Sequence, residues 1–351
     1  MDNLRAGGKG KEKIRGIYVG VDREGRIPLV CNCGSCKKQR KRWGEKPVAV
    51  MECVPVREKM REFAGNNINL ILASGLNENL VTEAHRNNIQ VYPIINFTSD
   101  NAKNLSPDWY MTNAAGEKVP YGDPGNPGYR EFLIRPAVEL VKKYDIDGIS
   151  LDFSRYIEME ISGDCCYCAA CRKKFRLKYD FDPIVLAVPG KKTPPRELSQ
   201  QAGQYLWNKE RKDNITTLVS ELKKAICGVK KGIKLSSYVW GAEPVSRLVF
   251  QDWSQWIEDK SLDWVNPSGY DYDLDSFQRR CVELAAIVNK RCPSCITLGQ
   301  HTTHGRVKNA AELIRQIKIA DKAGLVDGFV LFTHSLKTLS SYLPSIKRVK
   351  I

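Results

Sequence analysis

Short apolar runs rich in β-branched and aromatic residues recur along the chain, separated by segments whose apolar residues have helical spacing. This alternation is typical of βα units around a parallel sheet. Eight such runs occur, at residues 48–54, 68–73, 89–97, 146–153, 233–240, 262–270, 296–301 and 326–334. Because eight parallel strands and their helices close into a barrel, the sequence predicts an α/β fold of the (β/α)8 TIM-barrel class.

Two segments fall outside this alternation. Apolar residues at 17–21 and 27–30 flank the turn-forming Arg23-Glu24-Gly25, which predicts an N-terminal hairpin leading into a Cys-rich extension. A long insertion with a Cys cluster and a Pro-rich stretch follows the fourth predicted strand. We therefore expect an extension over residues 1–46 and a catalytic barrel over 47–351, whose insertion at 158–214 shapes the active-site face.

The charge balance is strongly basic. The 351 residues include 55 Lys and Arg against 40 Asp and Glu, a formal net charge of +15. Such an excess attracts polyanions, including acidic polysaccharide and nucleic acid. The densest basic run, residues 37–42, is similar to the basic patches with which proteins bind nucleic acid. No recognised nucleic-acid-binding motif accompanies it, so nucleic acid is the weaker alternative partner.

Hydropathy excludes some protein classes. Apolar residues make up 42% of the chain, as in soluble globular proteins, and no run of 18 apolar residues occurs, so we expect no membrane span. Residues 1–13 are polar and contain no hydrophobic signal region. We therefore expect a cytoplasmic protein, or an exported one if a signal has been removed. The oligomeric state stays open.

The fourth predicted strand ends in a carboxylate. In Asp147-Gly-Ile-Ser-Leu-Asp152, alternate residues face opposite sides, so Asp152 shares one side with Gly148 and Ser150. Carboxylates late in a barrel strand usually serve chemistry. The structural alternative is that Asp152 pairs with Arg155 or caps the next helix.

Two motifs carry a family resemblance. The turn Asp123-Pro-Gly-Asn-Pro and the strand Tyr144-Asp-Ile-Asp-Gly-Ile-Ser-Leu-Asp-Phe-Ser-Arg-Tyr156 resemble glycosyl-hydrolase-like barrel proteins of the family-10-like type. Their hallmark is a DPGNP turn, a helix and then YDVDGIHLDYIRYP. The resemblance continues in order through residues 251–256, 262–270 and 323–332, and covers about 47–340. It implies an eight-stranded barrel that acts on a polysaccharide or oligosaccharide.

Glycoside hydrolysis needs two carboxyl groups across the scissile bond, one that donates a proton and one that acts as nucleophile or base. The candidates at predicted strand ends are Glu52, Asp152, Glu243 and Asp271. We expect Asp152 as nucleophile or stabiliser and Glu243 as acid/base, which would resemble the amylase-type arrangement, with Asp271 as a further catalytic candidate. Retention or inversion of the anomeric configuration stays open.

Other residues at predicted strand ends suit sugar recognition, because aromatic faces stack on pyranose rings and planar polar groups bind hydroxyls. The expected substrate-binding residues are Arg155, Asn96, Trp240, Tyr270, Tyr272, His301, His334 and Glu52. The net charge adds the expectation that the sugar is anionic or an amino sugar.

Twelve cysteines form two close clusters, Cys31-x-Cys33-x2-Cys36 and Cys165-Cys166-x-Cys168-x2-Cys171. Such spacing suits thiolate ligation of zinc, with disulfides or free thiols as alternatives. The second cluster resembles the trio that holds a structural zinc in family-42 β-galactosidases together with an earlier Cys. That resemblance implies Cys166, Cys168 and Cys171 as ligands, joined here by a thiol of the first cluster, such as Cys33 or Cys36. No organic cofactor is expected.

Three functions follow from the sequence. The first is a glycoside hydrolase. The second is a carbohydrate-binding barrel without hydrolysis, because Ser154 stands where similar chitinase-type barrels have their catalytic Glu, although Tyr270-Asp271 matches a second chitinase motif. The third is a nucleic-acid-binding or RNA-modifying barrel, suggested by the basic run beside the first Cys cluster.

Overall fold

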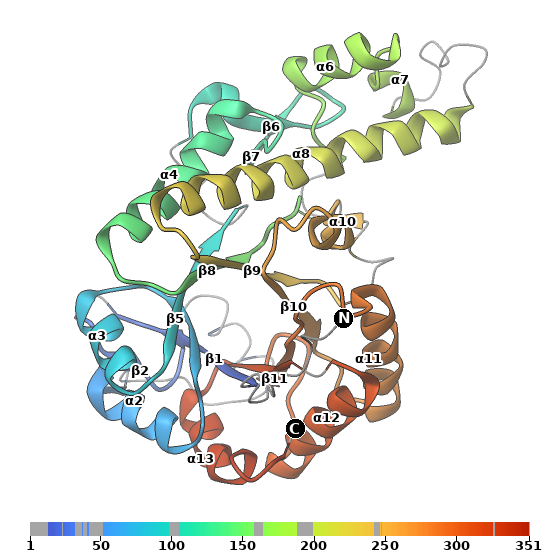
Figure 1. Cartoon of the computed structure of the whole chain (residues 1–351). Helices are drawn as coiled ribbons and strands as arrows, with labels where there is room; N and C mark the ends of the chain where they lie inside the picture. The colour runs from blue at the N-terminus through green and yellow to red at the C-terminus, as the bar shows by residue number, and fades with distance from the viewer. Residues whose placement is uncertain are drawn as a thin grey trace, which may run out of the picture.

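Eight parallel strands form a closed barrel, which confirms the predicted fold class (Figure 1). The strands are β1 (Ile14–Gly20), β4 (Leu70–Ser74), β5 (Gln90–Asn96), β8 (Gly148–Asp152), β9 (Lys234–Val239), β10 (Trp264–Gly269), β11 (Ile296–His301) and β12 (Gly328–Thr333). The computed structural model describes residues 13–22, 24–31, 37, 41, 52–97, 105–157, 164–187, 199–241, 246, 248–325 and 327–350.

Helices surround this barrel. In chain order they are α2 (Val56–Gly65), α3 (Glu78–Arg86), α4 (Pro127–Lys143), α8 (Gln200–Val229), α10 (Trp253–Glu258), α11 (Leu274–Val288), α12 (Ala310–Ala323) and α13 (Leu336–Ile346). Strand residues of one parity, such as Ile149 and Leu151, pack against these helices in the main core. Residues of the other parity, such as Tyr92 and Trp264, fill the barrel interior. The period of two along each strand thus builds two cores from one sheet.

Capping residues explain where the helices begin and end. Asn126 caps α4 by accepting hydrogen bonds from the backbone N–H groups of Gly128 and Tyr129, and Pro127 supplies the fixed φ of a first helical turn. α12 begins after Asn309, whose side chain accepts from the Glu312 N–H. It ends at Gly324, whose φ of 100° lies in the left-handed region that favours glycine.

The first barrel strand differs from the prediction. β1 pairs in parallel with both β12 and β4, so the residues expected to open an N-terminal hairpin belong to the barrel. Of the run 48–54, expected as the first strand, the described part holds β3 (Cys53–Val54), which pairs antiparallel with β2 (Ile27–Pro28) outside the barrel. A hairpin arm and a barrel strand share the same period of two, and the partners of β1 lie far away in sequence.

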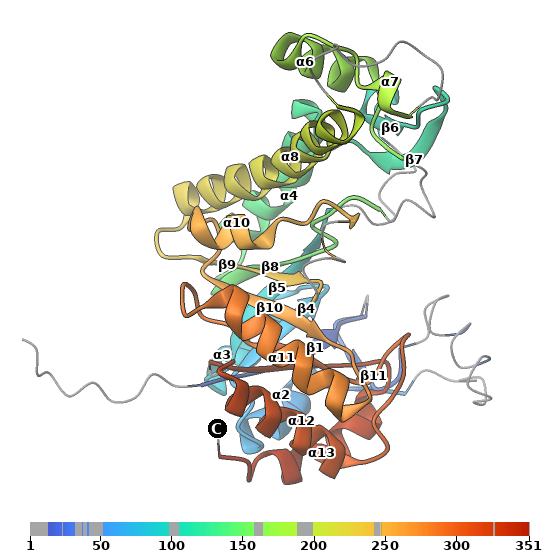
Figure 2. The same ribbon diagram turned by 90° about the vertical axis from the view of Figure 1, so that its right-hand side faces the viewer.

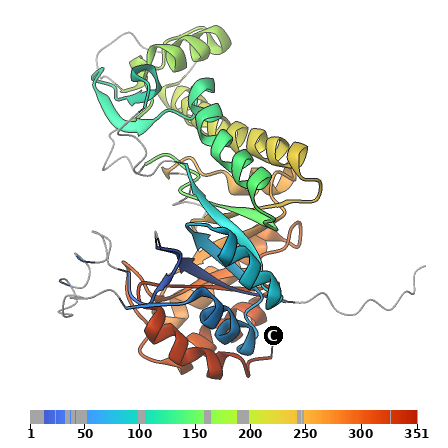
Figure 3. The same cartoon turned by 90° about the vertical axis from the view of Figure 1, so that its left-hand side faces the viewer.

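A group of smaller elements lies beyond α4 and α8, away from the barrel (Figures 2 and 3). It contains α6 (Ala169–Tyr179) and α7 (Ile184–Ala187), which follow β8, and the hairpin of β6 (Tyr110–Thr112) and β7 (Lys118–Gly122), which follows β5 and the short helix η2 (Pro107–Trp109). A bridge between Asn113 and Cys165 joins the two parts. Segments on either side of α4 therefore meet at one place.

None of the helices in the described part of the chain is long and apolar enough to cross a membrane.

Candidate active site

A cavity of about 640 Å³ opens where the barrel strands end. Its lining comes from the carboxyl ends of β1, β8, β9, β10, β11 and β12 and from the segments that follow them. The lining residues are Tyr18, Asp152, Phe153, Arg155, Tyr238, Trp240, Gly241, Gln251, Ser268, Tyr270, Asp271, Arg280, Thr302, Thr303, His304, Phe332 and His334. This is the end of a TIM barrel at which active sites form.

Asp152, the last residue of β8, lines this cavity. Its Oδ1 accepts a hydrogen bond of 2.8 Å from the Phe153 N–H, and it forms no salt bridge with another described residue. Burial raises the pKa of the Asp152 carboxyl to about 6, although the Phe153 N–H and the charge of Arg155 act in the opposite direction. A carboxyl with such a pKa carries a proton for part of the time near neutral pH.

Aromatic rings form much of the wall around Asp152. Tyr270 lies centrally, with ring centroids 5.9 Å from Tyr238 and 5.8 Å from Phe332. Tyr18 meets Phe332 edge to face at 5.3 Å. Burial and, to a smaller extent, the charge of Asp152 raise the pKa of the Tyr18 hydroxyl, so this group stays protonated as a hydrogen-bond donor. Rings and hydroxyls of this kind suit a sugar ring.

Arg155 lies between two rings of the same wall. Its guanidinium carbon is 4.4 Å from the Trp240 ring centroid and 4.9 Å from that of Phe153. Its Nη1 donates a hydrogen bond of 3.1 Å to the carbonyl of Tyr156. Stacking on aromatic faces and a planar fork of donors make Arg suited to fixing such rings in place.

Asp271, a second carboxyl in the cavity lining, is engaged by Arg280 of α11. Nε and Nη2 of Arg280 contact the two carboxylate oxygens, the Nη2–Oδ1 distance being 3.2 Å. The two carboxyls thus differ in environment: Asp152 is desolvated by burial, whereas Asp271 is paired with the Arg280 guanidinium.

Ser154, at the position of the chitinase-type Glu, is fully buried behind the cavity wall. Its hydroxyl shares a hydrogen bond of 2.8 Å with that of Ser237, and Gln251 donates to its carbonyl. Ser154 therefore holds the strand ends together and presents no group to the cavity.

The structure brings together many residues expected at the site. Asp152, Asp271, Arg155, Trp240, Tyr270 and His334 all line the cavity. Three others lie just behind this lining. Tyr272 shares a hydrogen bond of 2.7 Å with Thr302, the His301 ring packs on His334, and Asn96 stands beside Asp152 in register between β5 and β8.

Two expected site residues do not join them. Glu52 lies outside the barrel strands, exposed and paired with Lys337 at 2.8 Å, because the run that contains it does not form a barrel strand. Glu243 lies outside the described residues, as do Cys33 and Cys36.

Sequence reasoning missed several lining residues that carry a recognisable signal. Tyr238, Ser268 and Phe332 each precede an expected site residue by two positions. Because strand residues two apart share a face, these side chains point into the same space one layer deeper. Arg280 had no such signal, since it comes from a helix.

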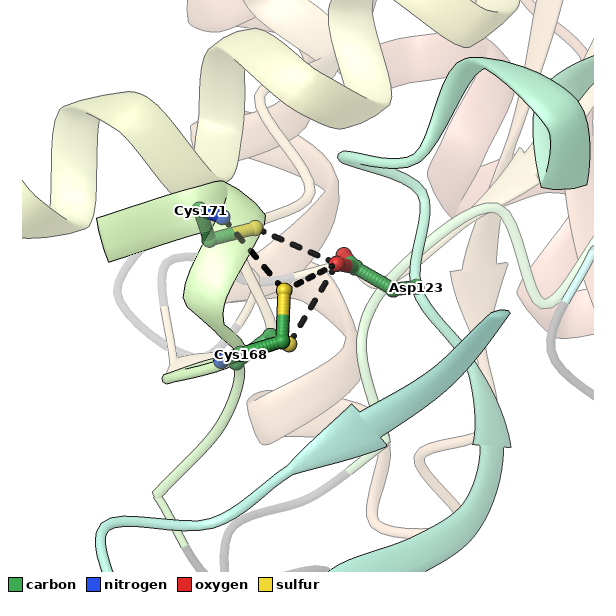
Figure 4. Close-up of side chains that lie close together, drawn as sticks. Asp123, Cys168 and Cys171 are labelled. Carbon is green, nitrogen blue, oxygen red and sulfur yellow. Dashed lines mark hydrogen bonds between the residues drawn. The ribbon is translucent and has the colours of Figure 1, made fainter. Parts of the chain in front are cut away.

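A second cluster of chemical groups lies in the elements beyond α4 and α8. The ligand atoms of Asp123, Cys166, Cys168 and Cys171 all lie within 4.8 Å of one another, so this cluster can hold a metal ion. The three thiols donate to Oδ2 of Asp123 at 3.1–3.3 Å. Figure 4 shows the side chains of Cys168 and Cys171 directed at the Asp123 carboxylate from the start of α6. Burial raises the pKa of Asp123 to about 7.

The sequence predicted an earlier Cys beside the three thiols, and the candidates Cys33 and Cys36 lie outside the described residues. Among the described residues, Asp123 is the fourth member of the cluster. Asp123 belongs to the turn between the β6–β7 hairpin and α4. Gly125 lies in the same turn, and a Cβ added to Gly125 would be only 2.9 Å from the Cys171 sulfur, so this turn packs closely against the thiols. Of the first Cys cluster, Cys31 is described, and its backbone N–H donates to the carbonyl of His334 at 3.0 Å. Cys spacing alone could not indicate that a carboxylate belongs to this cluster.

Comparisons with known proteins agree with this architecture. The family described as glycosyl hydrolase-like 10 matches residues 76–298, more than half of the chain. The curated glycosyl hydrolase YngK of Bacillus subtilis (strain 168) is 21% identical over 223 residues, which cover 54% of this chain and 38% of YngK. The chain thus spans well under half the length of that relative.

Solved glycosidase structures share the fold. A β-galactosidase from the psychrophilic Marinomonas ef1 superposes with a TM-score of 0.64 at 9% identity, covering 95% of this chain and 59% of that one. The β-galactosidase of Bacillus circulans sp. alkalophilus gives 0.58 at 15% identity, covering 79% and 47%. The C-terminal domain of a chitinase-like protein from Desulfitobacterium hafniense DCB-2 gives 0.52 at 10% identity, covering 96% and 100%.

Proposed function

The chain belongs to the glycosyl hydrolase-like 10 family, and from this premise we propose that it cleaves glycosidic bonds in a polysaccharide or oligosaccharide. The observation that carries the proposal is the Asp152 carboxyl, which is desolvated and without an ion pair to any described residue, in an aromatic-walled cavity at the carboxyl ends of the strands. Perturbed carboxyls in clefts are typical of acid–base chemistry.

We assign Asp152 the role of general acid. The sequence alone suggested a nucleophile or stabiliser, but a carboxyl whose pKa is raised to about 6 by burial is suited to protonate the leaving-group oxygen. The partner carboxylate is then Asp271, which the Arg280 guanidinium faces in the cavity, or Glu243, which follows β9 in sequence. The distance between its carboxyl group and that of Asp152 decides between retention and inversion.

The cavity walls favour a sugar as the group that enters. The aromatic wall supplies stacking faces, and Gln251, the Thr302 hydroxyl and the guanidinium groups supply polar contacts. The net charge of +15 favours an acidic polymer, which long-range attraction would concentrate at the protein.

We propose that the cluster of Asp123, Cys166, Cys168 and Cys171 holds a structural zinc ion. Tetrahedral zinc with Zn–S near 2.3 Å and Zn–O near 2.0 Å places sulfur and oxygen ligands about 3.5 Å apart, close to the observed 3.1–3.3 Å. Three thiols and a carboxylate fill four positions and leave none open, which suits a structural role. The ion would fix the turn before α4 to the start of α6.

The test of the proposed function is reducing-end release from neutral, acidic and amino-sugar polysaccharides by the purified chain. We expect release from at least one of these classes. Glycan binding without release from any of them would contradict hydrolysis and favour the carbohydrate-binding barrel, for which the engagement of Asp271 by Arg280 is the supporting observation.

The same assay has an expected pH dependence. Asp152 must carry its proton to act as the acid, and its pKa is about 6. We therefore expect kcat/KM to fall about tenfold for each pH unit above pH 6. The measurement is kcat/KM between pH 4 and 9 at constant ionic strength. A profile that instead rises through pH 6 to a plateau would show that the ionised form is required, and would contradict the acid role.

A further inference from the structure

Tyr156 lies between the metal-binding cluster and the cavity. Its ring is buried, and its hydroxyl accepts a hydrogen bond of 3.3 Å from Nδ2 of Asn214 in α8. The same Nδ2 lies beside the cluster, since a Cβ built on Gly125 would meet it and the Cys171 sulfur at 2.9 Å each. Lys174, one turn along α6 from Cys171, donates to the other atom of the Asn214 amide at 3.1 Å.

A second set of contacts leads to Tyr156 from residues 165–171, the Cys segment, which carries four cysteines. Nη1 of Arg211 donates to the carbonyl of Cys165 at 2.9 Å, and its guanidinium carbon lies 4.2 Å from the Phe250 ring centroid. Phe250 meets the Tyr156 ring edge to face at 5.3 Å. The Tyr156 hydroxyl and the Tyr156 ring therefore each have a contact that depends on where the Cys segment is held.

The main chain of Tyr156 contacts the cavity wall. Its carbonyl accepts a hydrogen bond from Arg155, which stacks on Trp240, and its N–H donates to the carbonyl of Val249 at 2.9 Å. Two residues near this contact are strained, since Phe153 has φ 51° and Phe250 has φ 57°. Left-handed backbone in a non-glycine residue is energetically unfavourable and persists only where the surroundings enforce it.

We propose that Tyr156 is a positioning residue that couples the metal-binding cluster to the Arg155–Trp240 wall of the cavity. The inference rests on the proposed function, in which this wall binds the sugar and the cluster holds zinc. A loaded cluster holds Asn214 and the Cys segment, these hold the Tyr156 ring, and its main chain holds Arg155 on Trp240. Without the ion, Arg155 and Trp240 are held less firmly in the cavity wall.

The test uses the full chain labelled with 5-fluorotryptophan and observed by fluorine NMR. The spectrum of Trp240→Phe identifies the Trp240 resonance among the seven tryptophans. We expect the Trp240 resonance to shift when a chelator removes the zinc. In Tyr156→Phe, which keeps the ring and its contact with Phe250 but loses the hydroxyl, we expect one zinc ion per chain and a Trp240 resonance that shifts less on chelation than in the wild type.

The matched control is Tyr167→Phe. Tyr167 lies between Cys166 and Cys168, and its hydroxyl bonds Asp164 at 2.6 Å, so the variant loses the same group nearer to the cluster but off the Asn214 contact. It should respond to chelation as the wild type does. Asn214→Ala breaks the same contact from the α8 side and serves if Tyr156→Phe does not fold.

Two results would overturn the coupling. One is a wild-type Trp240 resonance that is indifferent to zinc, and the other is a Tyr156→Phe protein that responds as the wild type does. The readout needs no turnover, so a chain that shows the response but releases no reducing ends keeps the coupling while the proposed hydrolysis fails.

Discussion

Asp152→Asn is expected to lose hydrolysis of its polysaccharide by about 10²–10⁴-fold, the contribution typical of a general acid. The amide keeps the shape of the side chain but has no acidic proton to give to the leaving oxygen. The measurement is kcat for reducing-end release by the variant and the wild type. The matched control is Asp145→Asn, near the opposite end of the same strand, where the side chain is 79% exposed. It should retain wild-type turnover.

The same variant should not lose stability at neutral pH. The folded pKa of Asp152 is about 6 against an ordinary 3.8, so its ionisation opposes folding, and the stability it contributes below pH 3.8 is lost as pH rises through 6. The loss amounts to about 3 kcal/mol above pH 7. Urea unfolding at pH 5 and pH 8 should show a smaller decrease for Asp152→Asn than for the wild type. An unfolded variant, or one with wild-type turnover, would refute the assignment.

Replacing one ligand of the metal-binding cluster is expected to have the largest effect on structure. Cys171→Ser and Asp123→Ala each remove a ligand that is buried where α6 meets the turn before α4. We expect both to lose the zinc ion. Local stability should fall by at least about 3 kcal/mol, a small part of the roughly 10–16 kcal/mol that structural zinc contributes in zinc-finger peptides.

The loss of stability should be largest in the elements beyond α4 and α8. Hydrogen exchange read by mass spectrometry should show lost protection in α6 and the β6–β7 hairpin, while β11 and β12 keep theirs. Cys227→Ser is the matched control, because this half-buried thiol in α8 lies outside the cluster and should leave one zinc ion per chain. Unchanged exchange in α6 after complete metal loss would show that the ion has no structural role.

The sequence predicts the barrel well because its signal is local. Alternation of strand and helix patterns identifies seven of the eight barrel strands, and the strand ends then locate Asp152, Trp240 and Tyr270 at one cavity. β1 was assigned to a hairpin because its period of two says nothing about partners elsewhere in the chain.

What depends on contacts between distant segments could not be predicted. The carboxylate of Asp123 reaches the thiols only because the β6–β7 hairpin and the segment after β8 meet beyond α4. Arg280 reaches Asp271 from a helix. The pKa of Asp152 depends on burial by several strands, so the sequence could identify the carboxyl but not its protonation state.

The most direct test of the central claim is the leaving-group dependence of Asp152→Asn. Two glycosides of the sugar found by the reducing-end assay would be compared, one with a 2,4-dinitrophenolate leaving group and one with an unactivated alkyl leaving group. Dinitrophenolate needs no proton to depart, so a general-acid variant should retain turnover within about tenfold on it and lose about 10²-fold or more on the alkyl glycoside. Equal losses on both would contradict the account and make Asp152 the nucleophile or stabiliser.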